Sequence, residues 1–231
     1  MTIPKRLPRL FLLLCLLWTA GAIGTGLASR VSVSPVTLQL QPNVRAAQLT
    51  LTNQGTTPVT FDLSLMAWSQ SGGQDVLSST QAVVVAPATV TLAPGKAQTV
   101  RLARLGNPTL SEQAYRLIVT ERPSGGVGVT TRLQLVLPLF DGPVSTTPTD
   151  DTTASADLNV QASLSPDGHI TLTNPGTTHL RLTTLELQVG GKWQPVPLLY
   201  LLAGQSRRLD MGGVQAVRYT AGGTARNVAL R

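Results

Sequence analysis

The sequence of 231 residues has few of the side chains on which catalytic and metal sites depend. It contains one cysteine, Cys15, and two histidines, His169 and His179. A zinc site needs several Cys, His or carboxylate ligands, and neither histidine has a cysteine or a third histidine to complete one. Both are interpreted as surface histidines. The sequence therefore predicts no metal, no other cofactor and no enzyme built on a nucleophile and a histidine base.

Charged residues, at 13%, and aromatic residues, at 4%, are also scarce. The formal net charge is +7, but the basic residues are scattered along the chain without a run of Lys and Arg. Nucleic-acid binding needs a basic patch, so we expect no nucleic-acid partner, and nothing predicts a small-molecule substrate. The 21 glycines and 16 prolines, together with many Thr and Val, favour an all-β protein over a helical one.

The longest apolar run, Leu10–Ala20, lies at the N-terminus and is short for a membrane span, which needs about 20 residues. Basic residues precede it and small residues suited to cleavage follow it: Lys5, Arg6 and Arg9, then Gly26 and Ala28. This predicts a cleaved secretory signal over residues 1–29, with an uncleaved anchor as the alternative. Cys15 lies inside the signal, so the mature chain has no disulfide, and its formal charge falls by three, from +7 to +4.

After the signal, short runs of alternating apolar and polar residues are separated by turn signals, as in strands with one buried face. The predicted runs of the first half are Val31–Gln41, Ala46–Asn53, Val59–Trp68, Val83–Leu102 with a turn at Pro94-Gly95, Tyr115–Glu121 and Val127–Phe140. They give about seven strands with turns every ten or so residues. This spacing is typical of an immunoglobulin-like sandwich.

Three local features of these runs lead to further predictions. Pro35 has no N–H for a ladder, so the first run should be an edge strand, or should break and switch sheets. The alternation slips at Met66–Trp68, which suggests a bulge, although Trp68 itself is expected in the core. Ser69–Asp75 (SQSGGQD) has the composition of a loop.

The composition changes sharply at Asp141–Asp157, which is rich in Thr, Ser, Pro and Asp and has no apolar periodicity. Strands are predicted again beyond it, at Leu158–Leu164, His169–Asn174, Leu180–Val189, Trp193–Pro197, Ser206–Leu209, Val214–Tyr219 and Asn227–Leu230. We therefore predict an N-terminal domain over residues 30–142, a linker over residues 143–157 and a C-terminal β-sandwich domain over residues 158–231.

Two stretches of the first half recur in the second half in the same order. LTNQGTTPVTF (Leu51–Phe61) returns as LTNPGTTHLRL (Leu172–Leu182), and LAPGKAQTVRL (Leu92–Leu102) returns more loosely as LLAGQSRRLDM (Leu201–Met211). Each is a strand, a glycine-containing turn and a strand. Two domains of one sandwich type explain the repeat, and convergent turn chemistry is the alternative.

The run Val127–Phe140 (VGVTTRLQLVLPLF) is about twice the usual strand length of 5–6 residues. Its apolar row comprises Val127, Val129, Thr131, Leu133, Leu135 and Leu137. Two interpretations are open at this point. The run is either a long core strand of its own sandwich, or a strand that offers part of its apolar row to another polypeptide.

Several motifs in the two halves are similar to those of one family. They are PATVTLAPGKAQTVRL (Pro87–Leu102), YRLIVTERP (Tyr115–Pro123), LPLF (Leu137–Phe140), LTNPGTTHLRLTTLEL (Leu172–Leu187) and LLYLLAGQSRRL (Leu198–Leu209). With them the chain resembles the PapD-like periplasmic pilus chaperones, and most of all the branch that acts on spore-coat-protein-U-like subunits. The resemblance implies an all-β fold of two immunoglobulin-like β-sandwich domains in an L or boomerang arrangement.

The resemblance also implies a function. Such a chaperone is not an enzyme: it binds pilus or coat subunits in the periplasm by lending a strand, which is called donor-strand complementation, and delivers them to an outer-membrane usher. The lent strand would be Val127–Leu137, and the free protein could cover it by self-association. Two other hypotheses are a secreted two-domain immunoglobulin-like module that binds an adhesion target or matrix, and a β-rich hydrolase.

The chain departs from the family at its anchoring positions. The family holds the C-terminal carboxylate of the subunit with two basic residues, and these positions carry Thr37 and Pro138 here. A third family position, an inter-domain arginine, is Gly142. The carboxylate then either binds another cation or is held weakly or not at all. The candidates are Arg101, Arg116 and Arg132, the last of which is equally well a solvated charge on the strand's other face.

Overall fold

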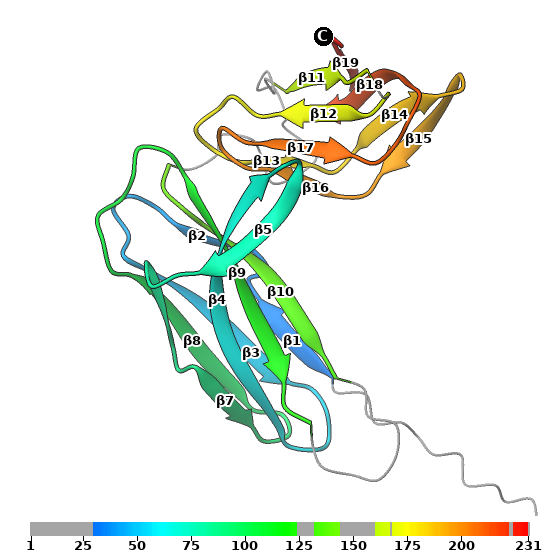
Figure 1. Ribbon diagram of the computed structural model, residues 1–231. Helices are drawn as coiled ribbons and strands as arrows, with labels where there is room; N and C mark the ends of the chain where they lie inside the picture. The colour runs from blue at the N-terminus through cyan, green and yellow to red at the C-terminus, as the bar shows by residue number, and fades with distance from the viewer. Residues whose placement is uncertain (1–29, 124–131, 144–159, 167, 222–223, 231) are drawn as a thin grey trace, which may run out of the picture.

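The computed structural model describes residues 30–123, 132–143, 160–166, 168–221 and 224–230. Every regular element in these residues is a β-strand, and they form two bodies that lie at an angle to each other (Figure 1). The all-β prediction is thereby confirmed. The predicted signal, most of the linker, and Val127, Val129 and Thr131 lie outside the described residues. No helix of the described chain could span a membrane.

The first body is a sandwich of two sheets. Its strands are β1 (Val31–Ser34), β2 (Leu38–Leu40), β3 (Ala46–Asn53), β4 (Val59–Ser71), β5 (Gln74–Ser79), β6 (Val83–Ala86), β7 (Thr89–Leu92), β8 (Ala97–Arg104), β9 (Gln113–Glu121) and β10 (Gln134–Asp141). One sheet has the order β1-β3-β8-β6 and the other β2-β10-β9-β4-β5, with β7 beside β4. Antiparallel pairing dominates, which suits strands joined by short turns.

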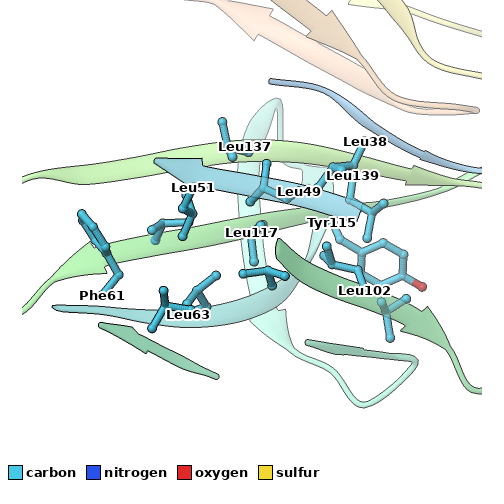
Figure 2. Packing of buried hydrophobic residues seen from close by; sticks show 14 of the residues in the cluster. Leu38, Leu49, Leu51, Phe61, Leu63, Leu102, Tyr115, Leu117, Leu137 and Leu139 are labelled. Atoms are coloured by element: carbon cyan, nitrogen blue, oxygen red, sulfur yellow. The ribbon is translucent and has the colours of Figure 1, made fainter. Parts of the chain in front are cut away.

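The core of this sandwich follows from the alternation of the sequence. In β3 the side chains of Leu49 and Leu51 point inward, and in β9 those of Tyr115, Leu117 and Val119 do the same. Figure 2 shows such side chains from both sheets meeting between them. Burial of about 25 cal/mol per Å² of apolar surface makes this core the main stabilising contribution.

The first predicted run breaks at Pro35 and continues in the other sheet. β1 pairs with β3 at the edge of one sheet, while β2 pairs with β10 in parallel in the second sheet. This confirms the expected switch, because a proline cannot donate to the ladder of either strand. The predicted strand Ala46–Asn53 and the turn at Gly95, with a φ of 70°, are also found.

The second body has its own core and smaller sheets. Its strands are β11 (Gln161–Leu164), β12 (Ile170–Thr173), β13 (Leu180–Leu182), β14 (Leu185–Val189), β15 (Lys192–Val196), β16 (Leu199–Leu201), β17 (Ser206–Leu209), β18 (Val214–Ala221) and β19 (Thr224–Val228). The sheets have the orders β11-β12-β17, β13-β16 and β15-β14-β18-β19. Ile170, Leu172, Leu187 and Leu201 are fully buried at their centre.

The sequence repeat corresponds to one structural motif built twice. Asn53 and Asn174 are each 2% exposed and bridge the turn that follows them. Asn53 Nδ2 donates to Thr57 O at 2.8 Å and Asn174 Nδ2 donates to Thr178 O at 2.8 Å. Each Oδ1 accepts from the glycine N–H two residues later, at 2.8 and 2.9 Å. The repeat therefore reflects a shared buried-asparagine turn rather than composition alone.

Two local predictions for β4 are wrong. The pairing of β4 with β9 runs without a register shift to Trp68, so there is no bulge at Met66–Trp68. The predicted loop is instead a hairpin, in which β4 continues to Ser71 and β5 begins at Gln74. Gly72 and Gly73 form its turn with φ values of 59° and 78°, as two-residue hairpins require.

Candidate functional site

The two edges of β10 are paired to different extents. On one side β10 pairs with β9 along its whole length, from Gln134 to Asp141. On the other side β2 pairs only with Leu139–Asp141. In the described part of the chain, the outer edge over Gln134–Pro138 therefore has no strand beside it. Figure 1 shows β10 running past the end of β2.

The ladder fixes which backbone groups point to this open edge. Glu121 N donates to Leu133 O at 2.9 Å, so odd-numbered residues bond to β9. Because the direction alternates along an antiparallel strand, the N–H and C=O of Gln134 and Val136 point outward to the open edge, and the C=O of Pro138 points outward toward Leu38 on β2. Pro138 has no N–H to lose at this edge, which explains how a proline fits inside a strand.

The side chains of β10 alternate in the perpendicular direction. Leu137 is buried, and Leu133 and Leu135 are partly buried against the first core, so these three predicted row members share the inward face. Val136 lies on the opposite face and is 46% exposed. The open edge thus combines unpaired backbone groups with apolar side chains that are incompletely covered.

A cation lies on the outer face of the same sheet. Arg116 on β9 is opposite Pro138 on one side and Met66 on the other. Its guanidinium carbon is 3.4 Å from the ring centroid of Trp68 and 5.8 Å from that of Tyr200. Within the described residues no carboxylate forms an ion pair with it. Burial lowers the pKa of Arg116 from its usual value, yet an arginine stays charged at neutral pH.

The other predicted anchors lie in different surroundings. Thr37 is exposed in the bend just before the Leu38–Leu139 pair, which puts it near Pro138 where the open edge begins. Arg101 is exposed on β8 in the other sheet, opposite Gln48 and Ala86. Arg132 is exposed just before β10. Of the predicted cations, only Arg116 lies level with the start of the open edge.

The C-terminal end of β10 packs against the second body. Phe140 is fully buried and stacks on His179, with ring centroids 3.5 Å apart and ring planes 6° apart. His179 Nδ1 is 2.8 and 3.0 Å from the two carboxylate oxygens of Glu112. Glu112 N also donates to Thr177 O at 2.9 Å. The interpretation of His179 as a surface histidine is therefore wrong, whereas His169 is half-buried.

The β4–β5 hairpin forms a second connection between the bodies. Gln70 is 8% exposed: its Nε2 donates to Tyr200 O at 2.8 Å and its Oε1 accepts from Leu202 N at 3.0 Å. At the hairpin tip, Arg208 N donates to Gly73 O at 3.1 Å. A Cβ on Gly73 would lie 2.5 Å from Arg208 Cβ, so the contact requires a glycine. The hairpin ties the first sandwich to β17.

Gly142 follows β10 at this junction and has no room for a side chain. Its φ is 139°, and an added Cβ would lie 2.9 Å from Glu112 Cα. An inter-domain arginine could not stand here. Two other polar contacts join the two bodies here: His179 Nδ1 lies 2.8 Å from Glu112 Oε1, and Arg207 forms an ion pair with Asp75 at 2.5 Å.

Sequence reasoning missed three residues of this site. Trp68 was expected in the core, but it is buried in the contact between the bodies, 6.2 Å from Phe140 and 5.7 Å from Tyr200 between ring centroids. Asp75 and Gln70 lie in the stretch whose composition predicts a loop. The available signal was the Gly-Gly pair, which with polar residues on both sides is typical of a two-residue hairpin.

Comparisons with known proteins give a family for the first domain and a fold for the chain. Residues 30–143 match the family described as "Pili and flagellar-assembly chaperone, PapD N-terminal domain". The chain is similar to a structure of the CsuC–CsuE chaperone–tip adhesion subunit complex of Acinetobacter baumannii pili, with 21% identity, a TM-score of 0.67 and coverage of 87% of this chain and 98% of the other.

Two further structures give the same picture. The chain is similar to the Escherichia coli chaperone DraB, with 19% identity, a TM-score of 0.62 and coverage of 88% and 97% of the two chains. It is also similar to a structure of the Salmonella enterica SafA pilin with the SafB chaperone, with 16% identity, a TM-score of 0.63 and coverage of 88% and 97%. No curated protein sequence matches the chain. At these identities the structures establish the fold.

Proposed function

Residues 30–143 of this chain belong to the family of pili and flagellar-assembly chaperones, and from this premise we propose that the protein is a periplasmic chaperone for pilus or coat subunits. It binds a subunit by lending an edge of its first domain and acts without catalysis. The sequence resemblance adds two points to this proposal. The subunit is of the spore-coat-protein-U-like type, and the chaperone delivers it to an outer-membrane usher.

The observation that carries this function is the open edge of β10 over Gln134–Pro138. Its outward N–H and C=O groups match what an incoming strand needs, so a subunit that lacks one strand can extend this sheet. An unpaired apolar edge is also an aggregation hazard, which a chaperone tolerates because the subunit covers it. In the absence of a subunit, a second copy of the chain could cover it.

The donated side chains are proposed to be Val127, Val129, Thr131, Leu133, Leu135 and Leu137. Within this row, Leu133 and Leu135 are supported by their partial exposure at the end of the open edge farthest from β2. Leu137 is buried at 8% exposure and contributes more to the chaperone's own core. A secreted adhesion module is disfavoured, because it would have no need to leave this edge without a partner.

The carboxylate anchor is proposed to be Arg116. Its cross-strand partner is Pro138, one of the two positions where the family carries a basic residue, so Arg116 supplies a charge from the adjacent strand. The guanidinium carbon lies 3.4 Å from the centroid of the Trp68 ring, so a cation–π contact holds the charge at this position. A planar guanidinium suits a carboxylate better than a lysine would.

The test is co-expression of the chain with a secreted β-rich subunit encoded beside it. We expect a soluble heterodimer, which the double substitution Leu133→Asp and Leu135→Asp abolishes. The matched control is Leu77→Asp on β5, the opposite edge of the same sheet, where Leu77 is 43% exposed. An unchanged complex with the double variant would count decisively against a lent β10 edge, as would equal loss with the control.

A further inference from the structure

A pocket lies between the first sandwich and the second body. Its volume is about 370 Å³, which is within the usual size range of small-molecule sites. Its walls come from β4, β5, β9, the segments that flank β5 and β9, and the turn between β16 and β17. Neither Arg116 nor any described residue of β10 lines it. The pocket is therefore separate from the open edge and from the proposed carboxylate anchor.

The pairing of β4 places three lining residues in one row. Ala67 is opposite Ser78 on β5 and opposite Tyr115 on β9. Residues that face each other in a ladder share one side of the sheet, and Tyr115 belongs to the first core. Figure 2 shows the Tyr115 ring at one end of the core side chains. The row therefore lies on the inner side of the sheet, where the core ends and the pocket begins.

The hydroxyl of Tyr115 is a polar group without a partner. Tyr115 is 5% exposed, and its hydroxyl makes no hydrogen bond within the described chain. It is also not among the described polar atoms that are sealed from solvent, so it opens into the pocket that Tyr115 lines. Burial and the Asp141 carboxylate raise the pKa of Tyr115 against the opposing effect of Arg104, so the hydroxyl is a donor at neutral pH.

The second body supplies the Gln205 side-chain amide to the same pocket. The first sandwich holds this side chain in place, because Gln205 Oε1 accepts a hydrogen bond from Gln70 N. Gln205 Nε2 makes no hydrogen bond within the described chain. The hydroxyls of two further lining residues, Ser69 and Ser78, make none there either. The pocket thus contains available hydrogen-bonding groups from both bodies.

The pocket has little charge. Glu112 is the only charged side chain among the described lining residues, and its two oxygens lie 2.8 and 3.0 Å from His179 Nδ1. Its side chain is 1% exposed, so it is not available to a ligand. Ala82 and Leu202 contribute apolar surface. A neutral ligand with hydroxyls and apolar C–H faces matches this lining, whereas a charged ligand would lose hydration without gaining a countercharge.

We propose that this pocket is a binding site for a neutral saccharide of mono- or disaccharide size. The sugar hydroxyls bond to Tyr115, Gln205 and Ser69, and the C–H faces contact the apolar lining. Because the ligand contacts both bodies, it stabilises their arrangement by mass action. The site does not depend on the proposed function: sugar binding without a heterodimer refutes only the chaperone, and a heterodimer without sugar binding refutes only this site.

The experiment titrates the purified chain with methyl glucoside, N-acetylglucosamine and maltose, and with methyl glucuronide as the charged counterpart of methyl glucoside. The readouts are the NMR resonances of the Gln205 side-chain amide and the Ala67 and Ala82 methyl groups. We expect saturable shifts with the neutral sugars and none with the glucuronide. Melting temperatures are a poorer readout, because sugars excluded from protein surfaces stabilise folded proteins in general.

Two variants test the lining. Tyr115→Phe should weaken sugar binding about five-fold, the value of one hydrogen bond of ~1 kcal/mol. It should not lower stability, because the hydroxyl has no partner in the described chain. Ala82→Trp should fill the pocket and abolish binding. Its matched control is Val84→Trp, since Val84 is nearby on β6, 44% exposed and outside the pocket.

Three results would overturn the proposal: no saturable shift with any neutral sugar, equal shifts with the glucuronide, or unchanged sugar binding in Tyr115→Phe. Equal loss of binding in Ala82→Trp and Val84→Trp would also contradict it. A stronger response to N-acetyltriglycine amide than to every sugar would make this a peptide site and refute the saccharide assignment.

Discussion

Both halves of β10 pair with β9 along one edge, but their other edges differ. Leu139–Asp141 lies between β9 and β2, and all three residues are buried. Among the described strands, Gln134–Pro138 pairs with β9 alone, and Val136 on it is 46% exposed. One continuous alternating sequence is thus paired on both edges at one end and, among the described strands, on one edge at the other. The difference is made by a three-residue strand, β2.

The position of β2 is held by a buried ion pair, Arg104–Asp141, and the hydrogen bonds around it. Arg104 at the end of β8 pairs with Asp141, and its NH2 group lies 3.2 Å from the carbonyl oxygens of Pro42 and Val44, just after β2. Gly142 N donates to Leu40 O at 3.0 Å. Together these contacts fix where the covered half of β10 ends, and therefore where the open edge begins.

The largest expected effect on stability comes from breaking the Arg104–Asp141 ion pair. Arg104→Gln leaves the buried Asp141 carboxylate without its cation, which should destabilise the protein by about 3–5 kcal/mol. Burial already raises the pKa of Asp141, against the opposing effect of Arg104, and loss of the arginine should raise it further. The folded variant then takes up a proton at Asp141 more readily than the unfolded chain does. The loss of unfolding free energy caused by Arg104→Gln should therefore shrink as the pH falls.

The measurement is urea unfolding of both proteins at neutral and mildly acidic pH. The control is Arg101→Gln on the same strand, whose side chain is exposed and which should change stability by no more than about 0.5 kcal/mol. A deficit in Arg104→Gln that grows on acidification would contradict the buried-pair explanation.

A smaller effect distinguishes the two edges of β10 directly. Val136→Pro removes an outward N–H, so the folded protein should keep its stability while the subunit complex weakens about five-fold, the value of one backbone hydrogen bond of ~1 kcal/mol. Leu135→Pro removes an N–H that bonds to β9 and should instead destabilise the chain itself. Melting temperatures and binding titrations of the two variants separate these outcomes. The assignment of the edges fails if the two prolines behave alike.

Local signals in the sequence predicted much of this arrangement. Pro35 predicted the break between β1 and β2, and the alternation placed Leu133, Leu135 and Leu137 on one face. The repeated LTN-x-GTT motif predicted two similar units, and each contains the same buried asparagine turn. These features depend on residues close together in the chain, so their physical causes are visible in it.

What could not be predicted depends on the second body. Trp68 broke the alternation because the outer face of β4 is covered there by Tyr200 and Leu202, more than 130 residues later. His179 is buried for the same reason, against Phe140 and Glu112. The length of the open edge was also hidden, because it is set by where β2 stops and not by β10 itself.

Hydrogen exchange at single backbone amides tests the central claim most directly. In the free chain, at a concentration where it is monomeric, the Val136 amide should exchange rapidly while the Leu135 amide, bonded to β9, should be protected. In the complex with a subunit, Val136 should become protected and Leu135 should stay so. A Val136 amide that is already protected in the free monomer, or that still exchanges rapidly in the complex, would contradict the lent edge.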